Sequence, residues 1–144
     1  MENLKISTKA LIIRDNSILV VKKSPKCSQK YYTLPGGTQK AKETLHRSLA
    51  REVFEETGAT IDIDKLIWTS ERRIQPKSKQ ERITYKIEYI FRCFIKDGYK
   101  AKMGPIPDSN QIGVRWLSIE KLEQYRIVPK RLRATLNDLL LKLE

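Results

Sequence analysis

The chain has 144 residues, a length typical of one domain with a substantial buried core, so we predict a single domain over residues 1–144. Hydrophobic residues make up 40% and charged residues 32%, and no apolar run approaches the roughly 18 residues of a transmembrane helix, which excludes a helical membrane span. Lysine and arginine total 29 against 17 aspartate and glutamate, and the resulting net charge of +12 favours anionic partners such as nucleotides or RNA.

The N-terminal residues and the cysteines indicate a cellular compartment. The opening MENLKISTKALII lacks the basic segment, apolar core and small-residue cleavage site of a secretory leader. The two cysteines, Cys27 and Cys93, do not have the spacing of a metal site. We therefore expect a cytoplasmic protein with free thiols, and a disulfide between these cysteines is the less favoured alternative.

In chain order, the residue pattern first predicts a β-hairpin and a glycine turn. Residues 5–14 and 17–23 have the composition of strands, and Asp15-Asn16 between them is a typical hairpin turn. A basic loop and a short extended segment then lead to the sequence LPGG at 34–37. This sequence predicts a turn, in which glycine lets the backbone approach a ligand or take a positive φ.

A long amphipathic helix is predicted from Thr44 to Thr57. At about 100° per residue, one arc of this helix carries apolar side chains and a neighbouring arc carries carboxylates. Gly58 follows the last turn, in the position where a helix C-cap favours glycine. The apolar arc consists of Leu49, Ala50, Val53 and Phe54, and the acidic arc of Glu52, Glu55 and Glu56.

The second half of the chain predicts further strands, two loops and a C-terminal helix. The polar segment 71–82 is expected to form a long surface loop or a mobile hairpin. Ser118 is predicted to N-cap a short helix, and Pro129 to be the first residue of the final helix. Strands alternating with two substantial helices predict a layered α/β fold. The predicted strands are 60–68, 85–91 and 114–117, and the predicted helices are 119–124 and 129–143.

Three carboxylates on one helical arc require a compensating positive charge. Glu52, Glu55 and Glu56 repel one another, and they lie near the C-terminal end of the helix, where the helix dipole disfavours negative charge. Glutamate oxygens suit a hard cation such as Mg²⁺, which typically takes one or two carboxylates and the phosphates of its substrate. A solvated acidic patch is the alternative interpretation of these residues alone.

The segment from Gly37 to Ala59 carries the most specific pattern in the chain. It has the form G-x5-E-x7-R-E-U-x-E-E-x-G-U, where U is an aliphatic residue, and every defined position is filled. This pattern resembles the signature box of the Nudix hydrolases, which cleave a diphosphate linked to another group. The defined positions are Gly37, Glu43, Arg51, Glu52, Val53, Glu55, Glu56, Gly58 and Ala59.

The resemblance implies a Nudix fold, with a mixed β-sheet sandwiched between α-helices, and a role for each box residue. Glu52 and Glu56 are then the first choice as direct metal ligands, with Glu55 as a third ligand or as the holder of a metal-bound water. The backbone carbonyl of the residue matching Gly36 is also a metal ligand in relatives. Arg51 orients the catalytic glutamate, and Glu43 supports the metal cluster or the loop. The implied cofactor is Mg²⁺, for which Mn²⁺ substitutes.

Residues outside the box provide further candidates. Asp108 and Glu88 are possible extra acids, although a turn aspartate and a solvent-facing strand residue are the respective alternatives. Lys40 stands where many Nudix relatives have a glutamate, and it could contact a substrate phosphate or be merely solvated. Arg72 and Arg73, in a basic cluster, are the other candidate substrate-binding residues.

The leading hypothesis is therefore Mg²⁺-dependent hydrolysis of a diphosphate linkage in a nucleotide or nucleoside-diphosphate derivative, such as a nucleoside triphosphate, ADP-ribose or a nucleotide sugar. An alternative keeps this chemistry but places the diphosphate at the 5′ end of an RNA. A third hypothesis is a basic nucleic-acid-binding module with a vestigial acidic helix. The sequence determines neither the substrate, the phosphorus attacked, the general base, nor whether the chain forms a homodimer.

Overall fold

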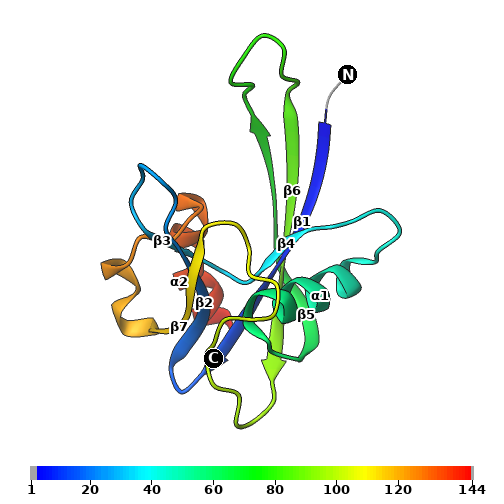
Figure 1. Cartoon of the computed structure of the whole chain (residues 1–144). Helices are drawn as coiled ribbons and strands as arrows, with labels where there is room; N and C mark the ends of the chain where they lie inside the picture. Colours follow the sequence, from blue (N-terminus) through cyan, green and yellow to red (C-terminus); the bar gives the residue numbers. More distant parts are fainter. Residues whose placement is uncertain (1–2, 144) are drawn as a thin grey trace.

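The computed structural model describes residues 3–143, which form seven strands, two α-helices and one 3₁₀-helix (Figure 1). The order alternates strands and helices, as the sequence predicts. The elements are β1 (Asn3–Arg14), β2 (Ser17–Lys23), β3 (Tyr31–Thr33), β4 (Gly36–Thr38), α1 (Leu45–Thr57), β5 (Ile61–Ile74), β6 (Thr84–Ile95), β7 (Gln111–Ser118), η1 (Ile119–Gln124) and α2 (Lys130–Lys142).

Strand β1 lies in the middle of the strand order and pairs with three other strands. It runs parallel to β6 from Asn3 to Ile12 and antiparallel to β4, while its last two residues pair with the start of β2. The strand order is β3-β2-β1-β6-β5, with β4 beside β1 and β7 beside β2. The sheet is therefore mixed, which confirms the predicted fold class.

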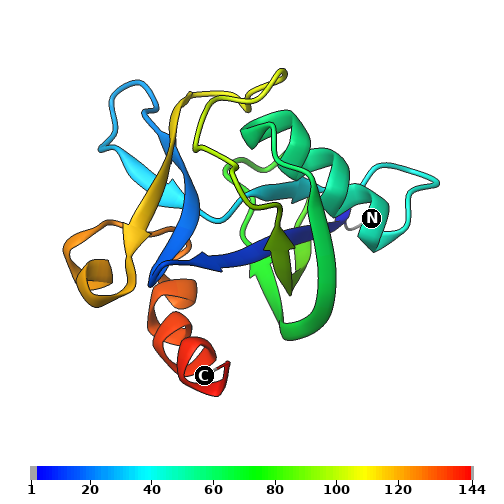
Figure 2. The ribbon, with the colours of Figure 1, turned by 90° about the horizontal axis from the view of Figure 1, so that it is seen from below.

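The two α-helices cover opposite sides of the strands, and alternation along β1 divides the core between them (Figures 1 and 2). Leu11 packs in the cluster that contains Leu132 and Leu136 of α2. Its neighbours in β1 point the other way, into the cluster that contains Leu49 and Val53 of α1. Successive strand residues face opposite sides of a sheet, so one apolar strand supplies both cores.

The buried face of α1 differs from the predicted apolar arc. Leu49 and Val53 are fully buried, but Ala50 is exposed and Phe54 is 44% exposed. In their place the helix buries Glu56, which is 3% exposed. The prediction for Ala50 and Phe54 was wrong because the helix docks with its C-terminal turn against β4, which rotates the acidic residues toward the sheet.

The polar segment predicted over 71–82 forms the end of a long hairpin. Strand β5 extends to Ile74 and pairs with β6 as far as Thr84, so only residues 75–83 connect the strands. The end of this hairpin projects beyond the rest of the molecule, beside the beginning of β1 (Figure 1). Of the two predicted forms, the hairpin is the one found.

The helix starts near the C-terminus agree in part with the prediction. Ser118 is the N-cap residue of η1, which spans the predicted residues 119–124, although the Ser118 side chain makes no capping hydrogen bond. Pro129 is the N-cap of α2 in an extended conformation, and the helix begins at Lys130. Among the helices of residues 3–143, none has the length and apolar character needed to cross a membrane.

The two cysteines differ in accessibility, which predicts different thiol reactivity. Both thiols are free; Cys27 is exposed, whereas Cys93 is buried and burial raises its pKa to about 12. Because the thiolate is the reactive form, an aromatic disulfide reagent at about pH 8 should modify Cys27 rapidly and Cys93 only after unfolding. Counting the released chromophore before and after denaturant checks this, and rapid release of both equivalents from the folded protein would contradict it.

Candidate active site

Helix α1 is held at both ends by its own sequence. At the start, the Thr44 hydroxyl accepts a hydrogen bond from the Arg47 N–H at 3.1 Å, which satisfies one of the free donors of the first turn. At the end, Gly58 takes the left-handed conformation at φ 71° and donates its N–H to the Phe54 carbonyl at 2.8 Å. These caps set the length of the helix, and with it the position of the three glutamates.

Glu56 is bound to the turn that precedes the helix. Its Oε1 accepts the backbone N–H of Gly36 at 2.9 Å. Burial raises the pKa of this carboxyl to about 7; the positive charge of Lys9 and the Gly36 hydrogen bond oppose the rise, and the charges of Glu52 and Asp108 add to it. A buried carboxylate with one hydrogen bond leaves an unneutralised charge, so this position favours a proton or a cation.

Glu52 lies directly against the next residue of the same turn. A Cβ atom on Gly37 would lie only 2.5–2.8 Å from three atoms of the Glu52 carboxyl group. Only glycine therefore leaves room for the carboxylate here. The two adjacent glycines of the turn thus hold two box glutamates, one through a hydrogen bond and one through close approach.

Arg51 links the remaining box acids. Its guanidinium donates two hydrogen bonds to Glu43, at 2.6 and 2.9 Å, one to Glu52 at 3.0 Å, and two to Glu55 at 2.9 and 3.4 Å. These contacts supply the compensating positive charge expected from the acidic arc. They also show why an arginine suits this position, because its planar fork can bind several carboxylates at once.

The pair formed by Arg51 and Glu43 predicts a pH dependence of stability. The Arg51 hydrogen bond, followed by the Lys40 N–H, lowers the pKa of Glu43 from 4.5 to about 2. The stabilisation is therefore complete above pH 4.5 and is lost as the pH falls toward about 2. We expect Glu43→Gln to lower the thermal unfolding midpoint at neutral pH, with the difference from wild type closing across this acidic range. A difference that persists unchanged at the lowest pH would contradict the assignment.

The loop before β7 docks on the exposed carbonyls at the end of α1. The Glu56 carbonyl accepts the Gly104 N–H at 2.9 Å and the Gln111 side-chain amide at 2.8 Å. This loop carries Asp108, whose carboxylate pairs with Lys23 at 2.5 Å. Burial alone would raise the pKa of Asp108, but the hydrogen bond and charge of Lys23 outweigh burial and hold it below its ordinary value.

A cleft of about 310 Å³ opens over the two glycines and Glu52. Three lysines from three different strands line it, together with two carboxylates. Lys9 and Lys86 were not predicted from the sequence. Each is a lysine within a strand, on the same side of the strand as a buried neighbour, and this position could have identified them. The lining residues are Ser7, Lys9, Lys23, Gly36, Gly37, Thr38, Glu52, Lys86 and Asp108.

The other predicted residues lie outside this cleft. Arg72 and Glu88 line a smaller adjoining cavity, and Arg73, the next residue of β5, is exposed and lines neither. Lys40 is exposed in the loop before α1, where its backbone N–H binds Glu43 at 2.8 Å. Glu55, held by Arg51, does not line the cleft.

Comparison with known families decides the classification. A sequence model described as the NUDIX domain matches residues 4–139. The chain belongs to the Nudix hydrolase family. The family expected from the box is thereby confirmed.

Individual Nudix relatives resemble the chain over most of its length. A Caenorhabditis elegans protein named as a nudix hydrolase is 28% identical over 131 residues, covering 88% of this chain but only 32% of that protein. The chain thus spans about a third of this curated relative. A Methanosarcina mazei MutT protein has a TM-score of 0.73 at 22% identity, covering 99% and 97% of the two chains. A Streptococcus suis ADP-ribose pyrophosphatase has a TM-score of 0.59 at 21% identity, covering 86% and 79%. These two structures support the fold.

Nudix enzymes generally use a divalent metal, and the oxygen donors here fit a hard cation. Within residues 3–143, no three acidic, imidazole or thiol side chains converge as a ready-made cage. The turn nevertheless brings Glu52 and Glu56 to adjacent glycines, and buried Glu56 lacks a full complement of donors. Two carboxylates and a backbone carbonyl are a sufficient protein contribution for Mg²⁺, which completes its shell with water and substrate phosphates.

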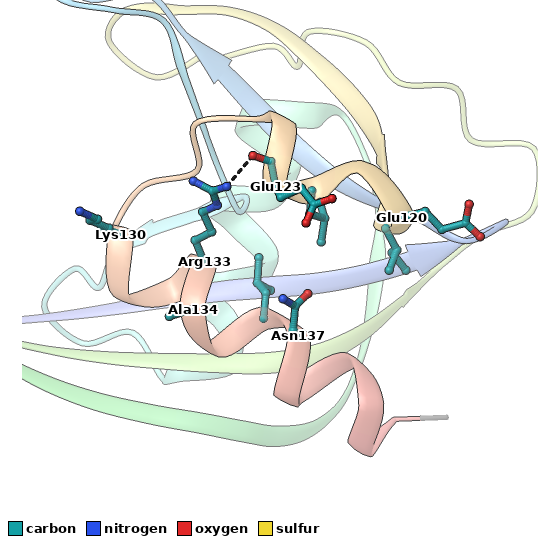
Figure 3. A pocket seen from close by; sticks show the side chains of 9 residues that line it. Glu120, Glu123, Lys130, Arg133, Ala134 and Asn137 are labelled. Atoms are coloured by element: carbon teal, nitrogen blue, oxygen red, sulfur yellow. Dashed lines mark hydrogen bonds between the residues drawn. The ribbon is translucent and has the colours of Figure 1, made fainter.

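A different hollow, between η1 and α2, contains no residue of the Nudix box. It has a volume of about 440 Å³, and its labelled residues include two glutamates opposite a lysine and an arginine (Figure 3). Arg133 donates a hydrogen bond to the Glu123 carbonyl across it. Because this hollow lies away from the box glutamates, the cleft over Gly36 and Gly37, which Glu52 lines, is the better candidate for diphosphate chemistry.

Proposed function

We propose that the chain hydrolyses a diphosphate linkage in a nucleotide or nucleoside-diphosphate derivative, with Mg²⁺ as cofactor and Mn²⁺ as a substitute. The observation that carries the proposal is the cleft itself. Its lining includes Glu52, held against Gly37, and the three lysines Lys9, Lys23 and Lys86. A site that combines carboxylates with cations suits a metal-bound polyphosphate.

The three lysines would bind the phosphate oxygens and hold the diphosphate over the box. Lysine is a compact point charge that contacts phosphate from several directions. Lys86 lines the cleft, and its partial burial removes water from the ammonium group, which lowers its pKa from 10.5. An anion that enters the cleft would restore favourable interactions to this ammonium.

Glu52, Glu56 and the Gly36 carbonyl would hold the cation, with Glu55 as the further candidate. When bound there, a divalent cation would neutralise phosphate oxygens and lower the pKa of a water molecule. Arg51 would position Glu52 and Glu55 through the hydrogen bonds already described, and Glu43 would position Arg51. These last two are positioning residues, because they act through their neighbours.

The attacking water must transfer its proton to a base. Glu52, which lines the cleft, and Asp108, on its opposite wall, are the candidates whose side chains face the cavity. Asp108 would first have to exchange its pair with Lys23. Asp108→Asn and Lys23→Gln, compared by their profiles of kcat against pH, would separate a base from a structural pair.

The names of the structural neighbours set the range of substrates to test. One neighbour is named as an ADP-ribose pyrophosphatase and another as a UDP-X diphosphatase. The proposal therefore covers nucleoside triphosphates, ADP-ribose and nucleotide sugars as substrate classes.

The direct test is a substrate panel with product identification. The purified protein is incubated with Mg²⁺ or Mn²⁺ and nucleotides, nucleotide sugars, ADP-ribose or dinucleoside polyphosphates, and the products are identified by mass spectrometry. Reactions in ¹⁸O-water show which phosphorus is attacked. Metal-dependent cleavage of one class supports the proposal, and a folded protein that cleaves nothing in the panel counts against it.

A 5′-triphosphate RNA is the second candidate, because basic residues continue outward from the site. Arg72 lines the cavity beside the cleft, and the projecting hairpin beyond it carries Arg73, Lys77, Lys79 and Arg82. An RNA held by several of these residues should lose affinity steeply as salt rises. The logarithm of the binding constant should fall with the logarithm of salt concentration with a slope near −0.7 per neutralised phosphate. A salt dependence equal to that of a free nucleotide would exclude the projecting hairpin from substrate binding.

A further inference from the structure

A second, smaller cavity adjoins the cleft and differs from it in chemistry. It has a volume of about 190 Å³ and shares Lys9, Lys23 and Lys86 with the cleft, so the two spaces are continuous along these lysines. Its remaining lining is of mixed character rather than cationic. Those residues are Tyr31, Thr33, Arg72, Glu88, Val128 and Pro129.

The feature that the diphosphate chemistry leaves unexplained is Glu88. It is 2% exposed, and its Oε1 has no hydrogen-bond partner within residues 3–143. The neighbouring Lys86 ammonium lies 3.9 Å from Oε2, beyond hydrogen-bond range. Ser7, the cross-strand neighbour of Glu88 in β1, likewise has a buried hydroxyl without a partner in the described chain. Unpaired buried polar atoms are costly, so their retention indicates that something else supplies the hydrogen bond.

Three of the other lining residues, Tyr31, Val128 and Pro129, are aromatic or aliphatic. Tyr31 and Thr33 project from β3, and the backbone of Tyr32 between them binds the segment before α2, through the Arg126 carbonyl and the Val128 N–H, both at 2.9 Å. This pairing brings Val128 and Pro129 to the same cavity as Tyr31. A cavity whose lining combines aromatic and aliphatic residues with a carboxylate suits a flat ring that carries hydrogen-bond donors.

We propose that Glu88 is a specificity-determining residue, and that this cavity receives the base of a nucleotide whose phosphates occupy the cleft; the inference rests on the function proposed above. A carboxylate accepts hydrogen bonds and donates none. Its two oxygens match two adjacent N–H donors, which guanine alone among the common bases presents on its Watson–Crick edge. Adenine, cytosine and uracil each place an acceptor beside their donor, which a carboxylate repels. The substrate class is therefore a guanine nucleotide.

The test compares guanine with hypoxanthine, which differs only in lacking the 2-amino donor. Binding of GDP, IDP, ADP, UDP and tripolyphosphate to the wild-type protein is measured by calorimetry in EDTA, so that metal-dependent hydrolysis does not interfere. We expect GDP to bind about tenfold more tightly than IDP, the discrimination typical of one well-placed bidentate contact. Tripolyphosphate reports the phosphate cleft alone.

Two variants with the same charge change separate recognition from general electrostatics. Glu88→Gln should reduce the preference for GDP over IDP to within about twofold. Because Glu88 lies beside Lys86, the variant also changes the affinity for tripolyphosphate, so the ratio of the GDP and IDP affinities is the measurement that decides. Glu71→Gln, at an exposed position on the neighbouring strand β5, should preserve the preference. Circular dichroism shows whether each variant is folded. If Glu88→Gln does not fold, the comparison of GDP with IDP on the wild-type protein still tests the inference.

Either of two results would overturn the inference. The first is equal binding of GDP and IDP by the wild-type protein. The second is a Glu88→Gln protein that changes its affinity for every ligand equally, tripolyphosphate included, because this would make Glu88 a counter-charge for the lysines. A preference for GDP without hydrolysis of any substrate would refute the proposed reaction but leave the base site supported.

Discussion

Glu52→Gln and Glu56→Gln should each lower turnover of the metal-dependent reaction by about a hundredfold or more. Removing one electrostatic contact to the transition state commonly has an effect of this size. Both carboxylates are held at adjacent glycines of one turn, so neither can take over the position of the other. The measurement is kcat and KM with Mg²⁺ on the substrate that the panel identifies.

The Glu56 variant allows loss of function to be separated from loss of structure. Glutamine retains the oxygen that accepts the Gly36 N–H, and it removes a carboxyl whose pKa burial raises to about 7. A buried acid of raised pKa destabilises the metal-free fold increasingly as the pH rises from 4.5 to about 7. At about pH 8 without metal, we therefore expect Glu56→Gln to be at least as stable as the wild type.

A suitable control for these variants is Glu81→Gln, which makes the same charge change in the exposed connection of the β5–β6 hairpin. This variant should keep full turnover. Near-normal turnover of both box variants, with metal dependence retained, would show that the metal ligands lie elsewhere in the protein.

The features that the sequence predicted well depend on residues close together in the chain. Asp15 and Asn16 both adopt positive φ, of 50° and 57°, as a two-residue hairpin turn between twisted strands requires. Gly58 ends α1 in the left-handed conformation for the same kind of local reason. The box pattern locates the helix and its acids because capping, helical spacing and the glycine turn all lie within one short segment.

The features that the sequence could not predict depend on strand pairing between distant segments. Lys9 and Lys86 line one cleft because β1 and β6 run parallel in a register that places Ser7 opposite Glu88. No local pattern specifies this register. The same applies to α1, where Glu56 and not Phe54 faces the protein, because the docking of β4 and of the loop at Gly104 decides which side is covered. Helical periodicity alone identifies an apolar arc but not the surface it meets.

Gly36→Ala should have the largest effect on stability of any single methyl addition in the site. Gly36 has a φ of 144°, which side chains rarely adopt, and an added Cβ would lie 2.0 Å from the Thr8 carbonyl oxygen across the β1–β4 pair. That obstacle is backbone, so it cannot rotate away as a side chain does. Combining strain with overlap, we expect a loss of about 2–4 kcal/mol in the free energy of unfolding. Denaturant titration measures it.

Gly113→Ala is the matched control, because a Cβ there would meet only the end of the flexible Arg115 side chain, at 2.6 Å. It should change stability by less than about 1 kcal/mol. The fraction of Gly36→Ala that remains folded should also lose activity, because moving the turn withdraws the N–H from Glu56 and shifts Gly37 beneath Glu52. A stable and fully active Gly36→Ala protein would mean that the turn does not position the carboxylates. The glycine pair would then have no part in placing Glu52 and Glu56 for the reaction.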